Sequence, residues 1–291
     1  MTPTPLFSIL IANYNNGKYL MEAVESVRQQ TYTRWEIILV DDASTDNSRD
    51  LYGDLEKDDR IHIYYNDVNH GCGYTKRRCA ELANGEICGF LDPDDALLPK
   101  ALEQHVEVYI NHENTAIVYS DCYLCDEKLN IVGEHRMQPI PVGSNLVETK
   151  QCYEIAHFAS YNRDKYLQTE GISAFLKAAV DQDLYQKVEE HGEVYVVHKF
   201  TYKYRILTQS IGHKDPLIPA YWNLLVLAAT CRRRNLNDMD YAMNWLRGPC
   251  VCGIEKKEQE VKSTRAYRLG RFLLSPITKA KKLYYKLRKK Q

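Results

Sequence analysis

The sequence lacks any apolar run long enough to cross a membrane. Its longest such run, Leu224 to Ala229, is far shorter than the roughly 20 residues that a spanning helix needs. No stretch ahead of Leu6 has the regions of a secretory signal, so we expect none. The composition is otherwise ordinary, with 44% hydrophobic and 26% charged residues, which excludes disordered, collagen-like and membrane-spanning classes.

The nine cysteines lack the regular spacing of a disulfide framework. Their odd number and wide scatter indicate reduced thiols, and hence a cytosolic compartment. Cys122 and Cys125 form a C-x-x-C pair in an apolar stretch that resembles a strand, but no second pair matches it. Because a structural zinc site needs four ligands, we do not expect zinc there.

Acidic residues are missing from the end of the chain. From Lys262 to Gln291 there are 11 Lys or Arg and no Asp or Glu, whereas residues 1 to 261 carry a net charge of −12. A basic amphipathic helix that rests on an anionic membrane is the favoured interpretation, and a coil or a solvated helix is the alternative. The acidic body disfavours nucleic acid as the partner. The apolar residues that recur at helical spacing in this tail are Leu269, Phe272, Leu273, Ala280, Leu283, Tyr284 and Leu287.

Apolar runs of strand length alternate with helical segments in the first 100 residues. Strands are expected at 6–12, 35–40, 61–65 and 86–91, with helices between them. This alternation is typical of an α/β fold, a Rossmann-like and mostly parallel sheet flanked by helices. Ligands bind such sheets at the carboxyl ends of the strands.

Carboxylates follow two of these strands at that edge. Asp42 comes after the second strand, and Asp92, Asp94 and Asp95 come after the fourth. One interpretation is a solvated acidic turn in which Asp95 caps the next helix. The other is a divalent-metal site in which Asp92 and Asp94 offer oxygen ligands to Mg²⁺ or Mn²⁺ that also holds a diphosphate.

Four motifs together resemble glycosyltransferase family 2, the inverting transferases of the GT-A fold that use nucleotide-diphosphate sugars. They occur in the order and spacing of the family, and the resemblance covers roughly residues 6 to 210. The motifs are Ser8 to Asn15, Ser26 to Thr31, Val40 to Asp46 and Leu91 to Asp95.

The resemblance implies a nucleotide-sugar site at the predicted sheet edge. Asp42 would accept a hydrogen bond from the base, usually uracil, in a pocket lined by Ala12, Asn13 and Tyr14. Lys76 stands where the family more often has arginine, so it keeps the charge but loses the two-pronged donor geometry. A contact of this lysine with the base or the diphosphate is what the resemblance implies.

The resemblance also implies a metal site and a general base. Asp92 and Asp94 match the DxD element, with Asp94 as the direct metal ligand and Asp92 nearer the ribose. Counting back from Lys187 gives Asp181 the role of base, and Asp183 is the alternate base because Val-Asp replaces the usual Glu-Asp pair. Alternatively, both acids lie in the first turn of a helix, where the helix dipole favours them.

Histidine is missing where a family motif usually ends with it. Tyr204 to Leu207 resembles that motif, so the role of the side chain is absent or moved. His198 and His213 are nearby candidates, and His157 is a candidate to face the acceptor. A lone histidine is, however, more often structural.

Residues 1–212 are expected to form the GT-A catalytic domain. Its nucleotide-sugar-binding half would be 1–100, and its acceptor-side half 101–212. Residues 213–291 would form a helical C-terminal extension, in which 215–250 pack against the catalytic body and the basic amphipathic tail follows.

These features predict an inverting, metal-dependent glycosyltransferase. It would move a sugar from a nucleotide-diphosphate sugar, with uridine as the expected base, to a hydroxyl of a lipid-linked or cell-surface glycan. It would work in the cytoplasm, peripherally on the inner face of the cell membrane. The alternatives are a nucleotidyltransferase, disfavoured because no glycine-rich phosphate loop follows the first strand, and a catalytically silent sugar-nucleotide-binding or scaffold protein. No pattern in the sequence predicts which sugar is transferred, which acceptor is used or what the oligomeric state is.

Overall fold

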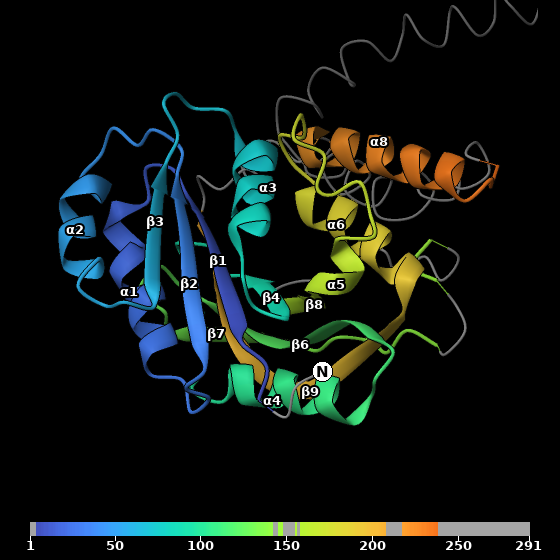
Figure 1. The fold of residues 1–291 in the computed structure, drawn as a ribbon, viewed down its shortest axis with the longest axis horizontal. Coiled ribbons are helices and arrows are strands. Elements are labelled where there is room, and N and C mark those ends of the chain that lie inside the picture. Colours follow the sequence, from blue (N-terminus) through green and yellow to red (C-terminus); the bar gives the residue numbers. More distant parts are fainter. Residues whose placement is uncertain (1–3, 142–144, 148–154, 156–157, 208–216, 238–291) are drawn as a thin grey trace, which may run out of the picture. The chain divides into compact units, whose positions relative to one another are not determined.

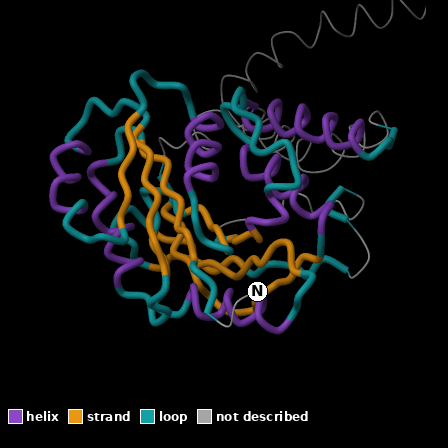
Figure 2. Tube along the Cα trace, in the orientation of Figure 1, coloured by secondary structure: helices purple, strands orange, loops and turns teal. Residues whose placement is uncertain are grey.

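The computed structural model describes residues 4–141, 145–147, 155, 158–207 and 217–237. Residues Met1–Asp238 form one compact unit, and the other unit, Met239–Gln291, lies outside the described residues. Within the described part, helices cover a sheet of nine strands that curls between its two halves (Figures 1 and 2). The predicted α/β class is therefore confirmed.

The first half of the sheet is parallel. Its strand order is β3-β2-β1-β4, and every residue of β2 is buried, as the continuous apolar run requires. The expected strands are confirmed to within a residue at each end. Its strands are β1 (Phe7–Asn13), β2 (Trp35–Asp41), β3 (Ile61–Tyr65) and β4 (Ile87–Phe90), and its helices are α1 (Gly17–Arg28), α2 (Ser48–Leu55) and α3 (Cys72–Leu82).

The second half of the sheet is mixed. Strand β8 lies antiparallel between β4 and β6, whereas β9 runs parallel to β6 and antiparallel to β5. Its strands are β5 (Ala96–Leu97), β6 (Thr115–Cys125), β7 (Ile131–His135), β8 (Ala159–Asn162) and β9 (Glu193–Arg205). Its helices are α4 (Ala101–Asn111), α5 (Arg163–Tyr166), α6 (Val180–Val188) with the 3₁₀ turn Glu189–His191, and α8 (Leu217–Arg233).

The register of the parallel strands brings their carboxyl ends together. Asn13 pairs with Asp41, and Asp41 pairs in turn with Tyr65. Just past the end of β4, the amide of Leu91 donates to the carbonyl of Leu10 at 3.0 Å. The turn that follows Leu91 therefore begins at the same edge as the turn after β2.

Helix α8 packs on α6. Arg233 and Arg234 near its end contact Glu190 at 2.8 and 2.9 Å, and Arg234 also pairs with Glu189. Packing of the 215–250 segment against the catalytic body was expected, and α8 does so over Leu217–Arg233. Residues 238–250 of that segment lie outside the described residues. The domain boundary between 212 and 213 stays a prediction.

The described cysteines Cys72, Cys79, Cys88, Cys122, Cys125 and Cys231 are free thiols. Burial raises the pKa of Cys72 to about 11 and that of Cys88 to about 12. Thiols with such pKa values are protonated at neutral pH and react slowly.

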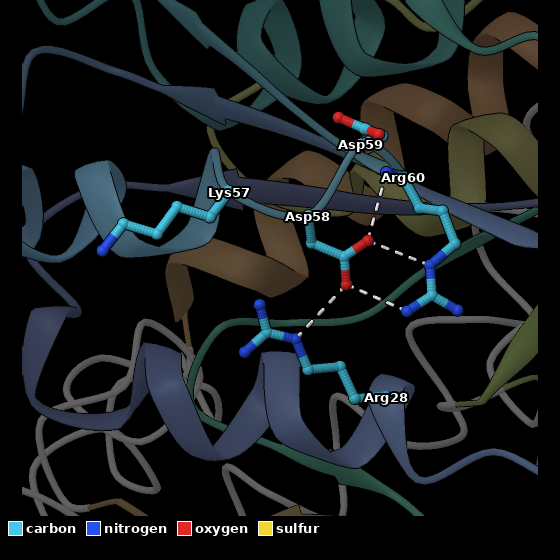
Figure 3. Close-up of a pocket in the computed structure, with 5 residues that line it drawn as sticks. All are labelled: Arg28, Lys57, Asp58, Asp59 and Arg60. Carbon is cyan, nitrogen blue, oxygen red and sulfur yellow. Dashed lines mark hydrogen bonds and ion pairs between the residues drawn. The ribbon is translucent and has the colours of Figure 1, made fainter.

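A shallow surface depression of about 570 Å³ lies at the other end of the strands, before β3 begins (Figure 3). Asp58 is its central carboxylate. The Arg60 guanidinium donates to it at 3.0 and 2.9 Å, and Arg28 approaches it to 3.6 Å. These hydrogen bonds from Arg60 lower the pKa of Asp58 to about 2. The cluster joins the end of α1 to the start of β3.

This lowered pKa predicts an acid-dependent loss of stability. An unfolded aspartate has a pKa of about 3.9, so Asp58 stabilises the fold above that pH, and its contribution is lost as pH falls toward 2. Asp58→Asn should lower the free energy of unfolding at pH 7 by at most about 1 kcal/mol, because the charges are partly exposed. The difference from the unmodified protein should shrink between pH 4 and pH 2 in urea unfolding. Asp59→Asn, at an exposed neighbour, is the control. A difference in the free energy of unfolding that does not change with pH would contradict the stabilising role of the Asp58 carboxylate.

Candidate active site

Asp42 lies at the carboxyl edge of the sheet, where it was expected, and is 3% exposed. Its Oδ1 accepts hydrogen bonds from Asn66 Nδ2 at 2.7 Å and from the His70 amide at 2.9 Å. Its Oδ2 accepts from the Gly71 amide at 2.8 Å, and the positive φ of Gly71, 91°, favours glycine there. The carboxylate is therefore fixed by the loop before α3.

The other three residues expected to line the nucleoside pocket differ in exposure. Ala12 is half-buried, Asn13 is buried, and Tyr14 is 45% exposed. Asn13 donates to Tyr52 Oη at 2.9 Å and to Ser48 Oγ at 3.0 Å. Asn13 thus ties β1 to α2, whereas Tyr14 offers an accessible ring next to the edge.

Asp41, the last residue of β2 and the neighbour of Asp42, has a structural role. It is fully buried and accepts hydrogen bonds from Tyr52 Oη at 2.5 Å and from the Ser44 amide at 2.9 Å. Burial and the neighbouring Asp41 raise the pKa of Tyr52. Successive side chains of a strand point to opposite faces, which separates the roles of Asp41 and Asp42.

Lys76 joins two parts of the predicted site. Its ammonium lies 3.1 Å from Asp92 Oδ1 and 2.9 Å from Asp181 Oδ1, and its side chain is 7% exposed. It also lies 5.0 Å from the ring centre of Phe90. Burial alone would lower the pKa of Lys76, but Asp181 and Asp92 outweigh it and raise the pKa well above its usual value. Asp92 of the predicted DxD element and Asp181, the predicted base, therefore share one cation.

Asp95 is not a helix cap, so that interpretation was wrong. It is 2% exposed, and it accepts from Tyr202 Oη at 2.9 Å and from the Arg205 amide at 2.6 Å. Burial and the nearby Asp94 and Asp92 raise its pKa well above the usual range. Helix α4 begins later, at Ala101, after the short strand β5. Asp95 therefore binds the turn after β4 to β9.

Arg205 is a buried residue of the site that sequence reasoning missed. Its Nε donates to the carbonyl of Asp94 at 2.5 Å, and its Nη2 donates to Glu22 Oε2 at 2.7 Å. It also stacks 4.4 Å from the ring centre of Tyr19 on α1. The signal was present, because Arg205 belongs to the motif that ends at Leu207.

The two candidate bases have different surroundings. Asp183 is 4% exposed and accepts from the Ser173 amide at 2.8 Å and from Lys187 Nζ at 2.9 Å. The side chain of Asp181 is 31% exposed and reaches Lys76. Both acids lie in the first turn of α6, as the dipole argument expected.

One of the three candidate histidines, His198, lies among the described residues. His198 has a side chain that is 58% exposed, and its Nδ1 lies 3.9 Å from Asp121 Oδ1 on β6. His157 and His213 lie outside the described residues. Among the described residues, no group of three or more His, Cys, Asp and Glu is arranged to hold a metal ion by itself.

A family profile described as glycosyl transferase family 2 matches residues 8–168, which is more than half of the chain. The chain belongs to glycosyl transferase family 2. The match covers Asp42, Lys76, Asp92 and Asp94, and it ends before Asp181.

Relatives of the chain align with it over part of their own length. Chondroitin synthase of Escherichia coli is 31% identical over 68% of this chain and 28% of its own. Uncharacterized glycosyltransferase alr2836 of Nostoc sp. is 38% identical over 38% of this chain and 35% of its own. Uncharacterized glycosyltransferase MJ1057 of Methanocaldococcus jannaschii is 28% identical over 69% of this chain and 71% of its own. The chain thus spans about a third of the length of the first two.

Solved glycosyltransferases share the fold. The crystal structure of S. aureus TarS 1–349 has a TM-score of 0.65 and 19% identity, and covers 81% of this chain and 68% of TarS 1–349. The complex of TarS with UDP-GlcNAc has a TM-score of 0.63 at 18% identity. The mannosyltransferase PcManGT from Pyrobaculum calidifontis, in complex with GDP-Man and Mn²⁺, has a TM-score of 0.54 and 12% identity over 94% of this chain and 85% of its own. The predicted GT-A fold is therefore confirmed.

Proposed function

We propose that the protein is an inverting glycosyltransferase that moves a sugar from a UDP-sugar to a hydroxyl of a lipid-linked or cell-surface glycan. The observation that carries the proposal is the shared contact of Lys76 with Asp92 and Asp181. Lys76 thereby connects Asp92, proposed to lie beside the diphosphate, with Asp181, proposed to lie beside the acceptor. The UDP-GlcNAc complex of TarS supports a uridine donor, and the E. coli chondroitin synthase supports a glycan acceptor.

The residues of the turn after β4 fit a divalent cation. Asp92 and Asp94 offer carboxylate oxygens two residues apart, the ligand type that Mg²⁺ and Mn²⁺ prefer, and both are half-buried. Arg205 holds the carbonyl of Asp94, and so fixes the backbone that carries this carboxylate. Asp94 would hold the cation, with Asp92 beside the ribose. A bound Mn²⁺ or Mg²⁺ would offset the negative charge that develops on the leaving diphosphate.

Asp181 is the carboxylate proposed to accept the proton of the acceptor hydroxyl. General-base catalysis requires a carboxylate within hydrogen-bond reach of that hydroxyl. Asp181 is partly exposed, whereas Asp183 is enclosed by Ser173 and Lys187. Attack from the side opposite the leaving diphosphate then inverts the anomeric centre in a single displacement.

Lys76 is proposed to add a second cation beside the diphosphate. Its ammonium lies within 3.1 Å of Asp92 and is shielded from water, where electrostatic interactions are stronger than in bulk solvent. The same ammonium holds Asp181 in place before the substrates bind.

The other two functions draw less support. The family membership does not support a nucleotidyltransferase, because the matching family is one of glycosyltransferases. A catalytically silent sugar-nucleotide-binding protein would bind donor without transfer, and the Asp181 test below separates it from an enzyme.

Removing the carboxylate of Asp94 should abolish metal-dependent donor binding. In titration calorimetry with UDP and Mn²⁺, Asp94→Ala should lower the affinity at least about tenfold, because the cation loses a charged ligand. Asp54→Ala, at a carboxylate on α2 whose side chain is 77% exposed, is the matched control and should bind normally. Equal affinity of the unmodified protein with and without Mn²⁺ would rule out this metal role.

Replacing Asp181 should separate binding from transfer. Asp181→Asn should keep UDP-sugar affinity within a few-fold and reduce the transfer rate by about 10² to 10⁴. Asp183→Asn should lower the melting temperature without a comparable loss of transfer by the folded protein, because it takes the nearest carboxylate, at 2.9 Å, from the buried Lys187. Both variants are compared by calorimetry, thermal unfolding and release of UDP from a UDP-sugar in the presence of glycan acceptors. Undiminished transfer by Asp181→Asn would move the base elsewhere, and absence of transfer in the unmodified protein would favour the silent binding protein.

The basic tail is proposed to attach the enzyme to an anionic membrane at its cytoplasmic face. No described helix is both long and apolar enough to cross a bilayer. Each Lys or Arg near an anionic surface contributes on the order of 1 kcal/mol, which the 11 basic residues from Lys262 to Gln291 supply in excess.

Deleting residues 262–291 should therefore abolish binding to anionic liposomes. The acidic remainder of the chain is repelled by the same surface, so sedimentation with phosphatidylglycerol vesicles should fall to background. Neutral vesicles are the control for non-electrostatic adhesion. Equal sedimentation of the full and truncated chains would contradict membrane attachment through residues 262–291.

A further inference from the structure

Helix α8 exposes an apolar face. Ile218, Tyr221, Leu225 and Ala229 recur every three or four residues and are all exposed, the first three by 45%, 59% and 38%. This spacing places them on one side of the helix. The residues on its other side, Val226, Leu227, Thr230 and Cys231, are buried.

An aromatic residue from the loop before α6 extends this face. Phe175 is 69% exposed, and its ring centre lies 6.4 Å from that of the half-buried Trp222. Trp222 in turn meets Tyr221 edge-on at 5.6 Å. We call Ile218, Tyr221, Leu225, Ala229 and Phe175 the α8 face. A contiguous apolar surface of this kind on a folded domain marks an interaction site.

The ends of α8 give this face a direction. Pro219 occupies the first turn, where a missing amide hydrogen is harmless, and Arg232 and Arg233 occupy the last. The helix ends at Arg233. Two residues later Asn235 adopts a positive φ of 58°, and the amide of Leu236 donates to the carbonyl of Cys231. Arg232 is exposed and continues the row that Ala229 ends. The face thus runs from apolar and aromatic side chains to a cation.

We propose that the α8 face rests on the surface of an anionic lipid bilayer. Exposed aliphatic and aromatic residues that end in arginine match the apolar and anionic layers of a membrane interface, where Trp and Tyr are enriched. Charge complementarity supports this occupant, because Arg232 and the 11 cations of Lys262 to Gln291 belong to the chain that follows the face. This inference rests on the membrane attachment in the proposed function, and adds a second surface that contributes only together with the tail.

The α8 face also lies near the segment that carries the proposed base. Helix α6 contacts both β6 and α8 (Figure 1). Asp181 lies in the first turn of α6, six residues after Phe175. A bilayer against the α8 face would therefore adjoin the segment that carries the proposed base. A lipid-linked acceptor anchored in that bilayer reaches the site from the side of α6.

The test uses the full chain with the face made polar. Ile218→Ser, Tyr221→Ser and Leu225→Ser are combined, and Ile131→Ser with Val132→Ser is the matched control, since these β7 side chains are 52% and 61% exposed. Partitioning onto vesicles of phosphatidylcholine and phosphatidylglycerol is measured by sedimentation. The triple variant should bind at least about tenfold more weakly, because it buries less apolar surface, and the control should bind normally. Thermal unfolding and UDP affinity should match the unmodified protein in both.

A second measurement reports directly on the α8 face. Brominated phospholipids in the same vesicles should quench the fluorescence of Trp222, and Trp222→Phe should lose that quenching. Unchanged partitioning of the triple variant together with absence of Trp222 quenching would overturn the proposal, even where the tail still binds. A loss of dimer in the triple variant, seen by light scattering without vesicles, would assign the face to a second copy instead. Donor binding measured in parallel distinguishes these outcomes from failure of the proposed enzyme function.

Discussion

The buried ammonium of Lys76 is the constraint on which the site depends. A cation removed from water costs several kcal/mol unless carboxylates compensate it, and here Asp92 and Asp181 do so. The three residues come from α3, from the turn after β4 and from α6. Stable packing of these elements therefore requires both acids at the edge where the donor and the acceptor would meet.

Arg205 provides a second buried cation with a similar effect. Its side chain connects β9 to the backbone of Asp94 and to Glu22 on α1. The Asp95 carboxylate accepts hydrogen bonds from the Arg205 amide and from the Tyr202 hydroxyl. The parallel first half and the mixed second half of the sheet are thus joined at the turn that carries the proposed metal ligands. Preorganised carboxylates need little rearrangement when a cation and a diphosphate bind.

Local patterns were enough to predict the parallel half of the fold. The apolar runs of β1 to β4 fixed the strands to within a residue, and parallel pairing then implied that Asp42 and Asp92 share an edge. Three features were out of reach: the antiparallel strand β8, the pairing of Lys76 with Asp181 across 105 positions, and the role of Asp95. Each depends on contacts between distant segments, which residue spacing does not encode. Asp95 in particular has the local signature of a cap, and only its burial against β9 distinguishes it.

A double-mutant cycle between Lys76 and Asp181 tests the central claim most directly. Lys76→Met, Asp181→Asn and the double variant are unfolded in urea without ligand, and the exposed pair Lys57 and Asp54 provides a parallel cycle as control. We expect a coupling free energy of about 1 to 3 kcal/mol for the buried pair, and none beyond error for the exposed one. A coupling indistinguishable from zero between Lys76 and Asp181 would contradict the account.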